Sequence, residues 1–172
     1  MGGAIALHIA SRPQAWPLLG VSATAIHVEA PDEVLQAWDA VPDGVVVDFT
    51  HEMRLMFMYG REGTFEPEVL GLAEKASEGI PVEELREVVG GWITDFPAIA
   101  AAVEVPVHYG LAEDENLWIS SPESVRAFGD AFTRSPRVAA EQVKGVGHNI
   151  DHHVDSQAFH QRQLDFAESV RP

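Results

Sequence analysis

The sequence contains no cysteine and few basic residues. Without cysteine, neither a disulfide framework nor a thiolate zinc site can form. Eleven lysines and arginines stand against 27 aspartates and glutamates, which gives a formal net charge of −16. This charge repels nucleic-acid phosphates and anionic lipid headgroups alike. We therefore expect neither nucleic acid nor a membrane surface as a partner.

Long apolar runs are also absent, and no segment approaches the length of a membrane span. The apolar stretch from Ala4 to Ala10 lacks the basic residues that begin a signal peptide, and Ala6 stands where a myristoylation signal needs Ser or Thr. We expect a soluble, cytoplasmic chain. Its 172 residues are enough for one domain with its own core.

Apolar patterning predicts helices that alternate with buried strands. Residues 1–11 have small side chains that suit a closely packed helix, which Pro13 must end. Residues 17–26 form an apolar stretch typical of a strand covered on both faces. Further strands are predicted at 105–112 and 137–146. The order predicts an α/β sheet.

Two later segments predict amphipathic helices. Ser121 suits the N-cap of a helix at 121–135, and Asp155 or Ser156 suits the cap of a final helix near 155–170. The apolar residues expected on the core-facing sides are Val125, Phe128 and Phe132 in the first helix, and Phe159, Leu164 and Phe166 in the second.

Between residues 31 and 103, proline and glycine break the sequence into short apolar segments. No strand alternation persists there, so we expect short helices joined by turns.

The predicted order is helix, strand, irregular insert, strand, helix, strand, histidine-bearing loop and helix. It resembles the C-terminal part of the α/β-hydrolase superfamily. The resemblance rests on "MGGAIALHIA", "VPVHYGLAEDENLW" and "VKGVGHNIDHH" with the helix after it, and it covers nearly the whole chain. It implies an α/β fold with about three hydrolase-sheet strands and flanking helices. Residues 1–172 would form a single incomplete domain, with a helical lid or cap inserted at 31–103.

In that family a Gly-x-Ser-x-Gly turn carries the nucleophile, and many members continue after the serine with Met-Gly-Gly or Leu-Gly-Gly and an apolar helix. "MGGAIALHIA" matches this continuation. The resemblance implies that Met1 follows the nucleophile and that its nitrogen lies at the oxyanion position. An N-terminal companion segment or chain would carry the serine and the earlier strands, as in a cleavage product or a separately made half. Alternatively, Met1 is an ordinary initiator and the glycines only permit tight helix packing.

The resemblance also gives His148, in "GVGHNI" after a predicted strand, the role of catalytic base. Imidazole suits this role because its pKa of about 6.5 lets it accept and return a proton near neutrality. The triad acid should lie in "GLAEDENLW", where Glu115 aligns best and Asp114 is a close rival beside Glu113. The acid would hold the imidazole tautomer and stabilise its charged form.

The motif "HNIDHH" also offers metal ligands in His148, His152 and either Asp151 or His153. His148 and His152 would face together only on a helix, and the flanking glycine and asparagine favour a loop. We expect no metal and no cofactor.

Apolar side chains of the insert and of the loop after the second strand suit a small apolar or aromatic ligand. The candidate substrate-binding residues are Leu55, Met56, Phe57, Tyr59, Trp92 and Trp118. Packing of these residues onto the core is the alternative. We predict an esterase-like hydrolase, acting by acyl transfer or ester hydrolysis with its N-terminal portion and inactive without it. A lyase or C–C bond enzyme on the same fold, and a non-catalytic binding chain, are the competing hypotheses.

Overall fold

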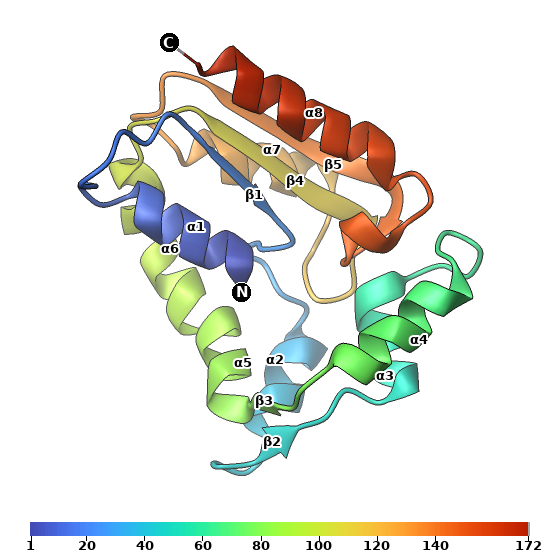
Figure 1. Cartoon of the computed structure of the whole chain (residues 1–172). Helices are drawn as coiled ribbons and strands as arrows, with labels where there is room; N and C mark the ends of the chain where they lie inside the picture. Colours follow the sequence, from blue (N-terminus) through green and yellow to red (C-terminus); the bar gives the residue numbers. More distant parts are fainter. Residues whose placement is uncertain (172) are drawn as a thin grey trace.

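The computed structural model describes residues 1–171. Its centre is a parallel sheet of three strands in the order β1-β4-β5, shown in Figure 1. The strands are β1 (Val21–Thr24), β4 (Val107–Asp114) and β5 (Val138–Gly147). Val21 pairs with Val107, which pairs in turn with Val138. Because all three strands are parallel, their carboxyl ends meet at one edge of the sheet.

The central strand is β4, and its side chains from Val107 to Ala112 are all buried. This continuous burial explains its unbroken apolar sequence. Strand β1 is shorter than predicted, because Ala25 adopts a left-handed backbone conformation with φ 56° and turns the chain away. The expectation that β1 is covered on both faces is wrong at Ser22, which is exposed and hydrogen-bonded to His108.

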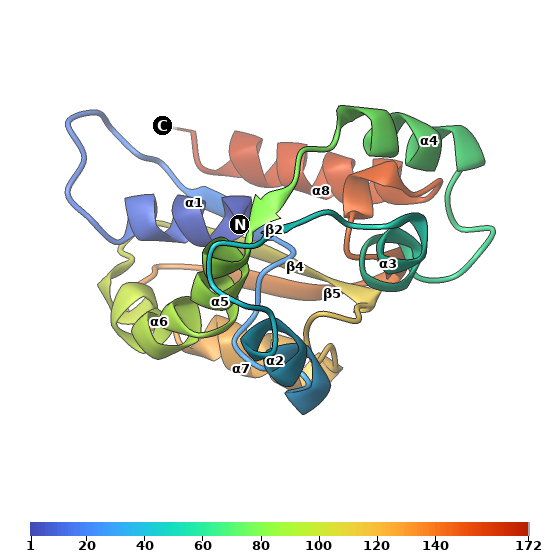
Figure 2. The same cartoon turned by 90° about the horizontal axis from the view of Figure 1, so that it is seen from below.

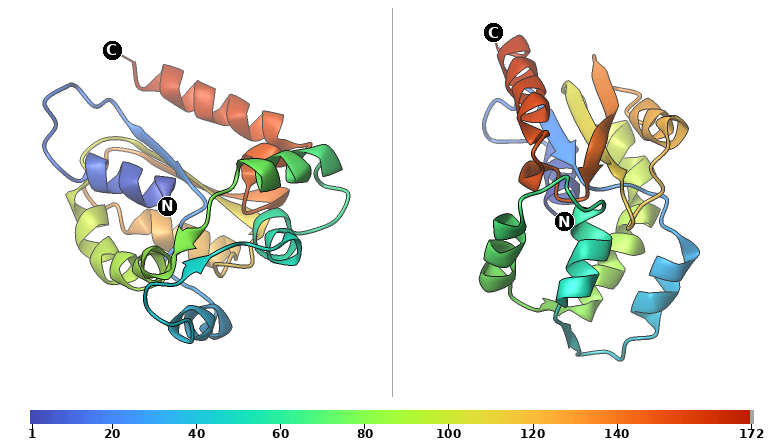
Figure 3. Two further views of the ribbon diagram at one scale, coloured as in Figure 1. Left: turned by 60° about the horizontal axis from the view of Figure 1, so that its bottom comes forward. Right: turned by 90° about the vertical axis from the view of Figure 1, so that its right-hand side faces the viewer.

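Three helices share one core with the sheet, and α8 covers the opposite face, as Figures 1 and 3 show. The three are α1 (Gly2–Ala10), α6 (Gly91–Ala102) and α7 (Pro122–Asp130), and α8 comprises Ser156–Ser169. Helix α1 packs closely on β1, since a Cβ on Gly3 would lie 2.5 Å from the Thr24 carbonyl oxygen. Gly3 therefore allows the close helix packing that was expected of the opening glycines.

The capping of α7 is confirmed. The Ser121 hydroxyl accepts a hydrogen bond from the Ser124 amide, and the Ser124 hydroxyl accepts one from the Ser121 amide. Val125 and Phe128 of its predicted apolar face are buried, and so is Phe132, which lies beyond the last residue of α7.

Helix α8 buries Phe159 completely, but the prediction for Leu164 is wrong. Leu164 is 60% exposed. Five residues turn an α-helix by about 140° beyond a full circle, so Leu164 lies on the side away from Phe159.

The segment 31–103 contains short helices, as expected, and two strands of two residues each that the sequence analysis missed. Its elements before α6 are α2 (Asp32–Asp39), β2 (Val46–Val47), α3 (His51–Arg54), the π-helix η1 (Leu55–Tyr59), α4 (Pro67–Ala76), β3 (Ile80–Pro81) and α5 (Val82–Val89). Strands β2 and β3 pair antiparallel. Two residues are too few for an alternating pattern to be visible.

Figures 1 and 2 show α2, α3 and the β2-β3 pair beside the carboxyl ends of the sheet strands. Helix α6 instead belongs to the central core, where Phe96, Ile99 and Ala100 are buried. Within the described chain, no helix combines the length and apolar character needed to cross a bilayer.

Candidate functional site

Two adjacent strands of the sheet end in polar side chains. Glu115 follows β4 and His148 follows β5. The two strands pair in parallel up to Asp114 and Gly147, with an irregularity in register between Ala112 and Asp114. The fold therefore brings Glu115 and His148 together at the carboxyl edge.

The His148 Nδ1 atom lies 2.8 Å from Glu115 Oε2. The Glu115 side chain is completely buried, whereas that of His148 is 14% exposed. The other carboxylate oxygen, Oε1, accepts a hydrogen bond from the Leu117 amide at 3.0 Å. Since an ionised carboxylate only accepts hydrogen bonds, Nδ1 donates to Glu115, and Nε2 has no hydrogen-bond partner among the described residues.

The neighbouring carboxylates have other partners. Asp114 Oδ2 lies 2.5 Å from Arg61 Nε. Glu113 accepts hydrogen bonds from the Gly145 amide at 2.9 Å and from Lys144 Nζ at 3.0 Å, and these bonds lower the pKa of its carboxyl group. Of the three acidic residues at the carboxyl end of β4 and directly after it, Glu115 alone contacts His148 in the described residues.

A cavity of about 120 Å³ lies beside His148. It is lined by Met1, Ala25, Trp38, Phe49, Met58, Ile80, Leu85, Val88, Val89, Leu117, Trp118 and His148. Met1 is the N-cap residue of α1, so the amino end of that helix reaches the cavity. The first amide groups of a helix have no partner within it and can donate to a bound oxygen. The cavity thus brings together the His148 imidazole, the amino end of α1 and an apolar wall.

Several solved structures resemble the chain. A monoacylglycerol lipase from Paleococcus ferrophilus aligns with a TM-score of 0.67 and 14% identity over 98% of this chain and 65% of its own. A thermophilic esterase from Thermogutta terrifontis gives 0.65 and 18% over 99% and 63%. A monoglyceride lipase from Saccharomyces cerevisiae gives 0.65 and 10% over 98% and 58%. No family model and no curated protein matches the chain.

The chain has the fold of the C-terminal part of an α/β hydrolase. The predicted fold class is thereby confirmed, including three parallel strands with helices on both faces. The chain spans 58 to 65% of the length of these three structures. Structural similarity at 10 to 18% sequence identity shows the α/β-hydrolase fold but does not identify a substrate.

Only one of the predicted substrate-binding residues, Trp118, lines the cavity beside His148. Tyr59 is completely buried and packs on Phe65, with its hydroxyl 2.8 Å from His152 Nδ1. Leu55 packs against the same cluster. Packing therefore accounts for both Leu55 and Tyr59.

The remaining three candidates also lie outside this lining. Trp92 packs on Phe96, and its indole N–H donates to the His27 carbonyl oxygen at 2.8 Å. Phe57 packs with Trp38 and Phe49 behind the cavity wall. Met56 is 58% exposed. The sequence analysis did not identify Trp38 and Phe49 as lining residues, since nothing local in their segments distinguishes a cavity wall from core.

The histidines after His148 each have a separate partner. His152 bonds to Tyr59, His153 accepts from the Gly147 amide, and His160 contacts Asp151 at 2.7 Å. In residues 1–171, no three His, Asp or Glu side chains converge as metal ligands would.

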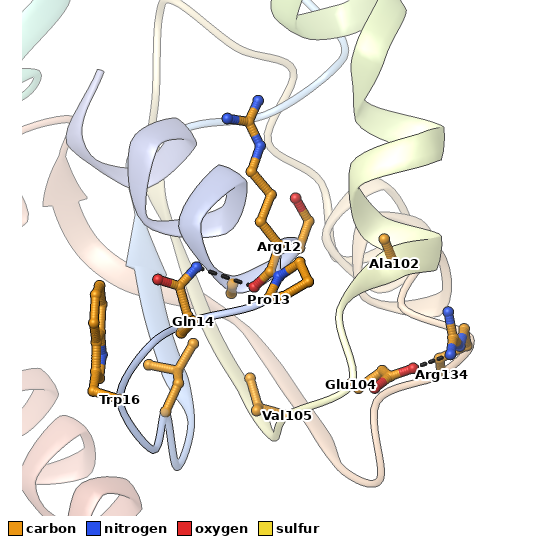
Figure 4. A pocket seen from close by; sticks show the side chains of 11 residues that line it. Arg12, Pro13, Gln14, Trp16, Ala102, Glu104, Val105 and Arg134 are labelled. Atoms are coloured by element: carbon orange, nitrogen blue, oxygen red, sulfur yellow. Dashed lines mark hydrogen bonds and ion pairs between the residues drawn. The ribbon is translucent and has the colours of Figure 1, made fainter.

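A larger hollow of about 430 Å³, shown in Figure 4, lies between the loop after α1 and the end of α6. Glu104 and Arg134 in its wall pair with each other, and the Gln14 side chain donates to the Arg12 carbonyl oxygen at 3.0 Å. The lining contains no imidazole beside a carboxylate. The smaller cavity beside His148 is therefore the better candidate for a reactive site.

Proposed function

We propose that this chain contributes the histidine and the acid of a Ser-His-Glu triad in an esterase-like α/β hydrolase. The observation that carries the proposal is the 2.8 Å contact between His148 Nδ1 and the buried Glu115 carboxylate, which leaves Nε2 free beside a cavity. His148 is the general base, and Glu115 orients it and stabilises the imidazolium that forms. Asp114, bound to Arg61, is not needed for this role.

The nucleophilic serine comes from a segment outside these residues, either an N-terminal companion segment or a partner chain. Within residues 1–171, no serine hydroxyl is hydrogen-bonded to His148. Strand β1 pairs with β4 on one side and has no partner strand on the other among the described residues. An unpaired strand edge favours addition of another strand. The exposed Ile5 and Ile9 of α1 offer apolar surface for the same companion.

In the assembled site, the serine oxygen attacks the acyl carbon while its proton moves to His148 Nε2. The Met1 N–H, at the amino end of α1, stabilises the oxyanion that forms. His148 then returns the proton to the leaving alcohol, and water releases the acyl group by the same route. The isolated chain is inactive by this mechanism because the attacking oxygen belongs to the companion.

The substrate presents a small apolar or aromatic group to the cavity. About 120 Å³ is close to the roughly 150 Å³ of an apolar cavity known to hold benzene. Part of the wall comes from the segment 31–103, through Trp38, Phe49 and Ile80. We propose that the part of this segment before α6 acts as the lid. The similar solved structures include a monoacylglycerol lipase and an esterase, which fits ester hydrolysis.

The test is fluorophosphonate labelling of the purified protein, followed by intact mass measurement of every polypeptide present. We expect a label on a serine of a segment that co-purifies with this chain or is joined to it, and loss of that label in His148→Gln. His160→Gln, an exposed histidine, is the control and should leave labelling unchanged. An active assembly without serine labelling would contradict the triad and favour non-hydrolytic chemistry on this fold. Ligand binding that survives His148→Gln, with no activity in any assembly, would favour a non-catalytic binding chain.

A further inference from the structure

His153 lies five residues after His148 and is buried to 3% exposure beneath two aromatic rings. Its ring centroid lies 6.3 Å from that of Tyr59 and 6.0 Å from that of Phe65. It therefore sits where the loop after β5 meets the π-helix η1 and the turn that follows it.

The hydrogen bonds of His153 determine which nitrogen carries the proton. The Gly147 amide donates to Nε2 at 2.9 Å, so Nε2 is unprotonated. The Thr64 hydroxyl donates to the Arg61 carbonyl oxygen at 2.7 Å, so at 3.0 Å it accepts from His153 Nδ1. Each hydrogen bond of this network therefore has one fixed donor and one fixed acceptor.

Gly147 immediately precedes His148, and its position is closely constrained. A Cβ there would lie 2.5 Å from the Tyr59 carbonyl oxygen, so the backbone packs directly on the end of η1. On the other side of His148, the Asn149 amide donates to the Met58 carbonyl oxygen at 2.8 Å. The backbone around His148 is held on one side through His153 and on the other by η1 itself.

We propose that His153 is a positioning residue, which holds the backbone at Gly147 and thereby aims the His148 imidazole at the cavity. The positioning of His148 by His153 rests on the hydrogen-bond network. Its importance for catalysis rests on the proposed function. His153 does not reach the cavity, whose lining it does not join. It acts through the amide of the residue before His148.

Burial of His153 favours its neutral form. Burial lowers its pKa, and the neighbouring His152 lowers it further, while Thr64 and the charge of Asp114 oppose the shift. Asp114 is itself paired with Arg61, and the packed faces of Tyr59 and Phe65 bring no charge. Protonation would place an N–H on Nε2 against the Gly147 N–H, so the bond exists only while His153 is neutral. Acid should release the Gly147 amide.

The test compares His153→Leu, which removes the acceptor, with His153→Gln, whose side-chain oxygen can accept the same bond without titrating. Amide hydrogen exchange at Gly147 is measured by NMR or mass spectrometry on the protein with any companion segment. We expect exchange to accelerate roughly tenfold or more in the Leu variant, as for an unmade buried hydrogen bond, and to be restored in the Gln variant. Acid should lower the protection of the Gly147 amide, measured relative to its intrinsic exchange rate at each pH, in the wild type but not in His153→Gln.

In the active assembly, His153→Leu should lower kcat roughly 10- to 100-fold with KM little changed, as expected for a misplaced base, and His153→Gln should recover most of it. If the Leu variant does not fold, Thr64→Val provides the same test, because it removes the hydrogen-bond partner of His153 Nδ1 with little change in volume. It should shift both readouts in the same direction as expected for His153→Leu. Thr64→Ser is its matched control.

Equal Gly147 exchange in wild type and in folded Leu and Val variants would overturn the positioning role. An exchange difference in a protein without any esterase activity would refute the proposed function and still support the role of His153 in the loop.

Discussion

His27 is a buried histidine whose titration should make folding sensitive to acid. It is 1% exposed and packs on Phe128, with ring centroids 5.2 Å apart. The Tyr109 hydroxyl donates to the Ile26 carbonyl oxygen at 2.7 Å, so at 3.1 Å it accepts from His27 Nδ1. His27 Nε2 has no hydrogen-bond partner among the described residues. A proton on Nε2 would therefore be buried without an acceptor.

Burial lowers the pKa of His27 from 6.5 to about 4. Between pH 6.5 and about pH 4, His27 is protonated in the unfolded chain but neutral in the folded chain. The contribution of neutral His27 to the free energy of unfolding is complete above pH 6.5 and is lost as the pH falls toward about 4. The difference between the two pKa values corresponds to about 3 kcal/mol.

The assay is urea unfolding at pH 7.5 and pH 4.5 on wild type and His27→Phe, each with the companion segment present. Wild type should lose about 2 to 3 kcal/mol more than the variant between the two pH values. The buried His153, whose pKa burial also lowers, contributes in the same direction to both proteins and cancels in the comparison. His160→Gln, at an exposed site, should keep the wild-type dependence. An equal loss in wild type and His27→Phe would refute the reasoning.

Three further predictions concern the site and the companion segment. In the assembled protein, His148→Ala should lower ester turnover by several orders of magnitude with little change in melting temperature, and wild-type activity would contradict the triad. Glu115→Gln should be nearly as harmful in the same assay, whereas Glu113→Gln and Asp114→Asn should leave most activity, since their partners are Lys144 and Arg61. Residues 1–172 expressed alone should aggregate or bind hydrophobic dyes, as sedimentation and thermal melting would reveal, because β1 leaves one strand edge unpaired. A compact monomer with a cooperative transition would argue against the companion.

The order of helices and strands could be predicted from the sequence because it depends on local patterns. Continuous apolar residues predicted β4, and the serine at position 121 predicted the start of α7, since a cap bonds only to the next few amides. The prediction failed where local patterns carry no information. Leu164 is as apolar as a core residue, yet the rotation of α8 turns it to solvent.

The choice among the three acidic residues at the carboxyl end of β4 depended on contacts across the fold. All three carboxylates have the same chemistry and lie side by side in the sequence. Glu113 is bound by Lys144 and Asp114 by Arg61, 31 and 53 residues away in the chain, and Glu115 alone meets His148.

The cavity wall likewise joins Met1, Trp38, Ile80 and Trp118 from separate segments. The sequence by itself determined the α/β class through its periodicity, and its resemblance to the α/β-hydrolase superfamily gave a short set of candidate residues. Only the tertiary structure decided which candidates meet, because each contact joins residues whose distance in space is set by the packing of the whole sheet.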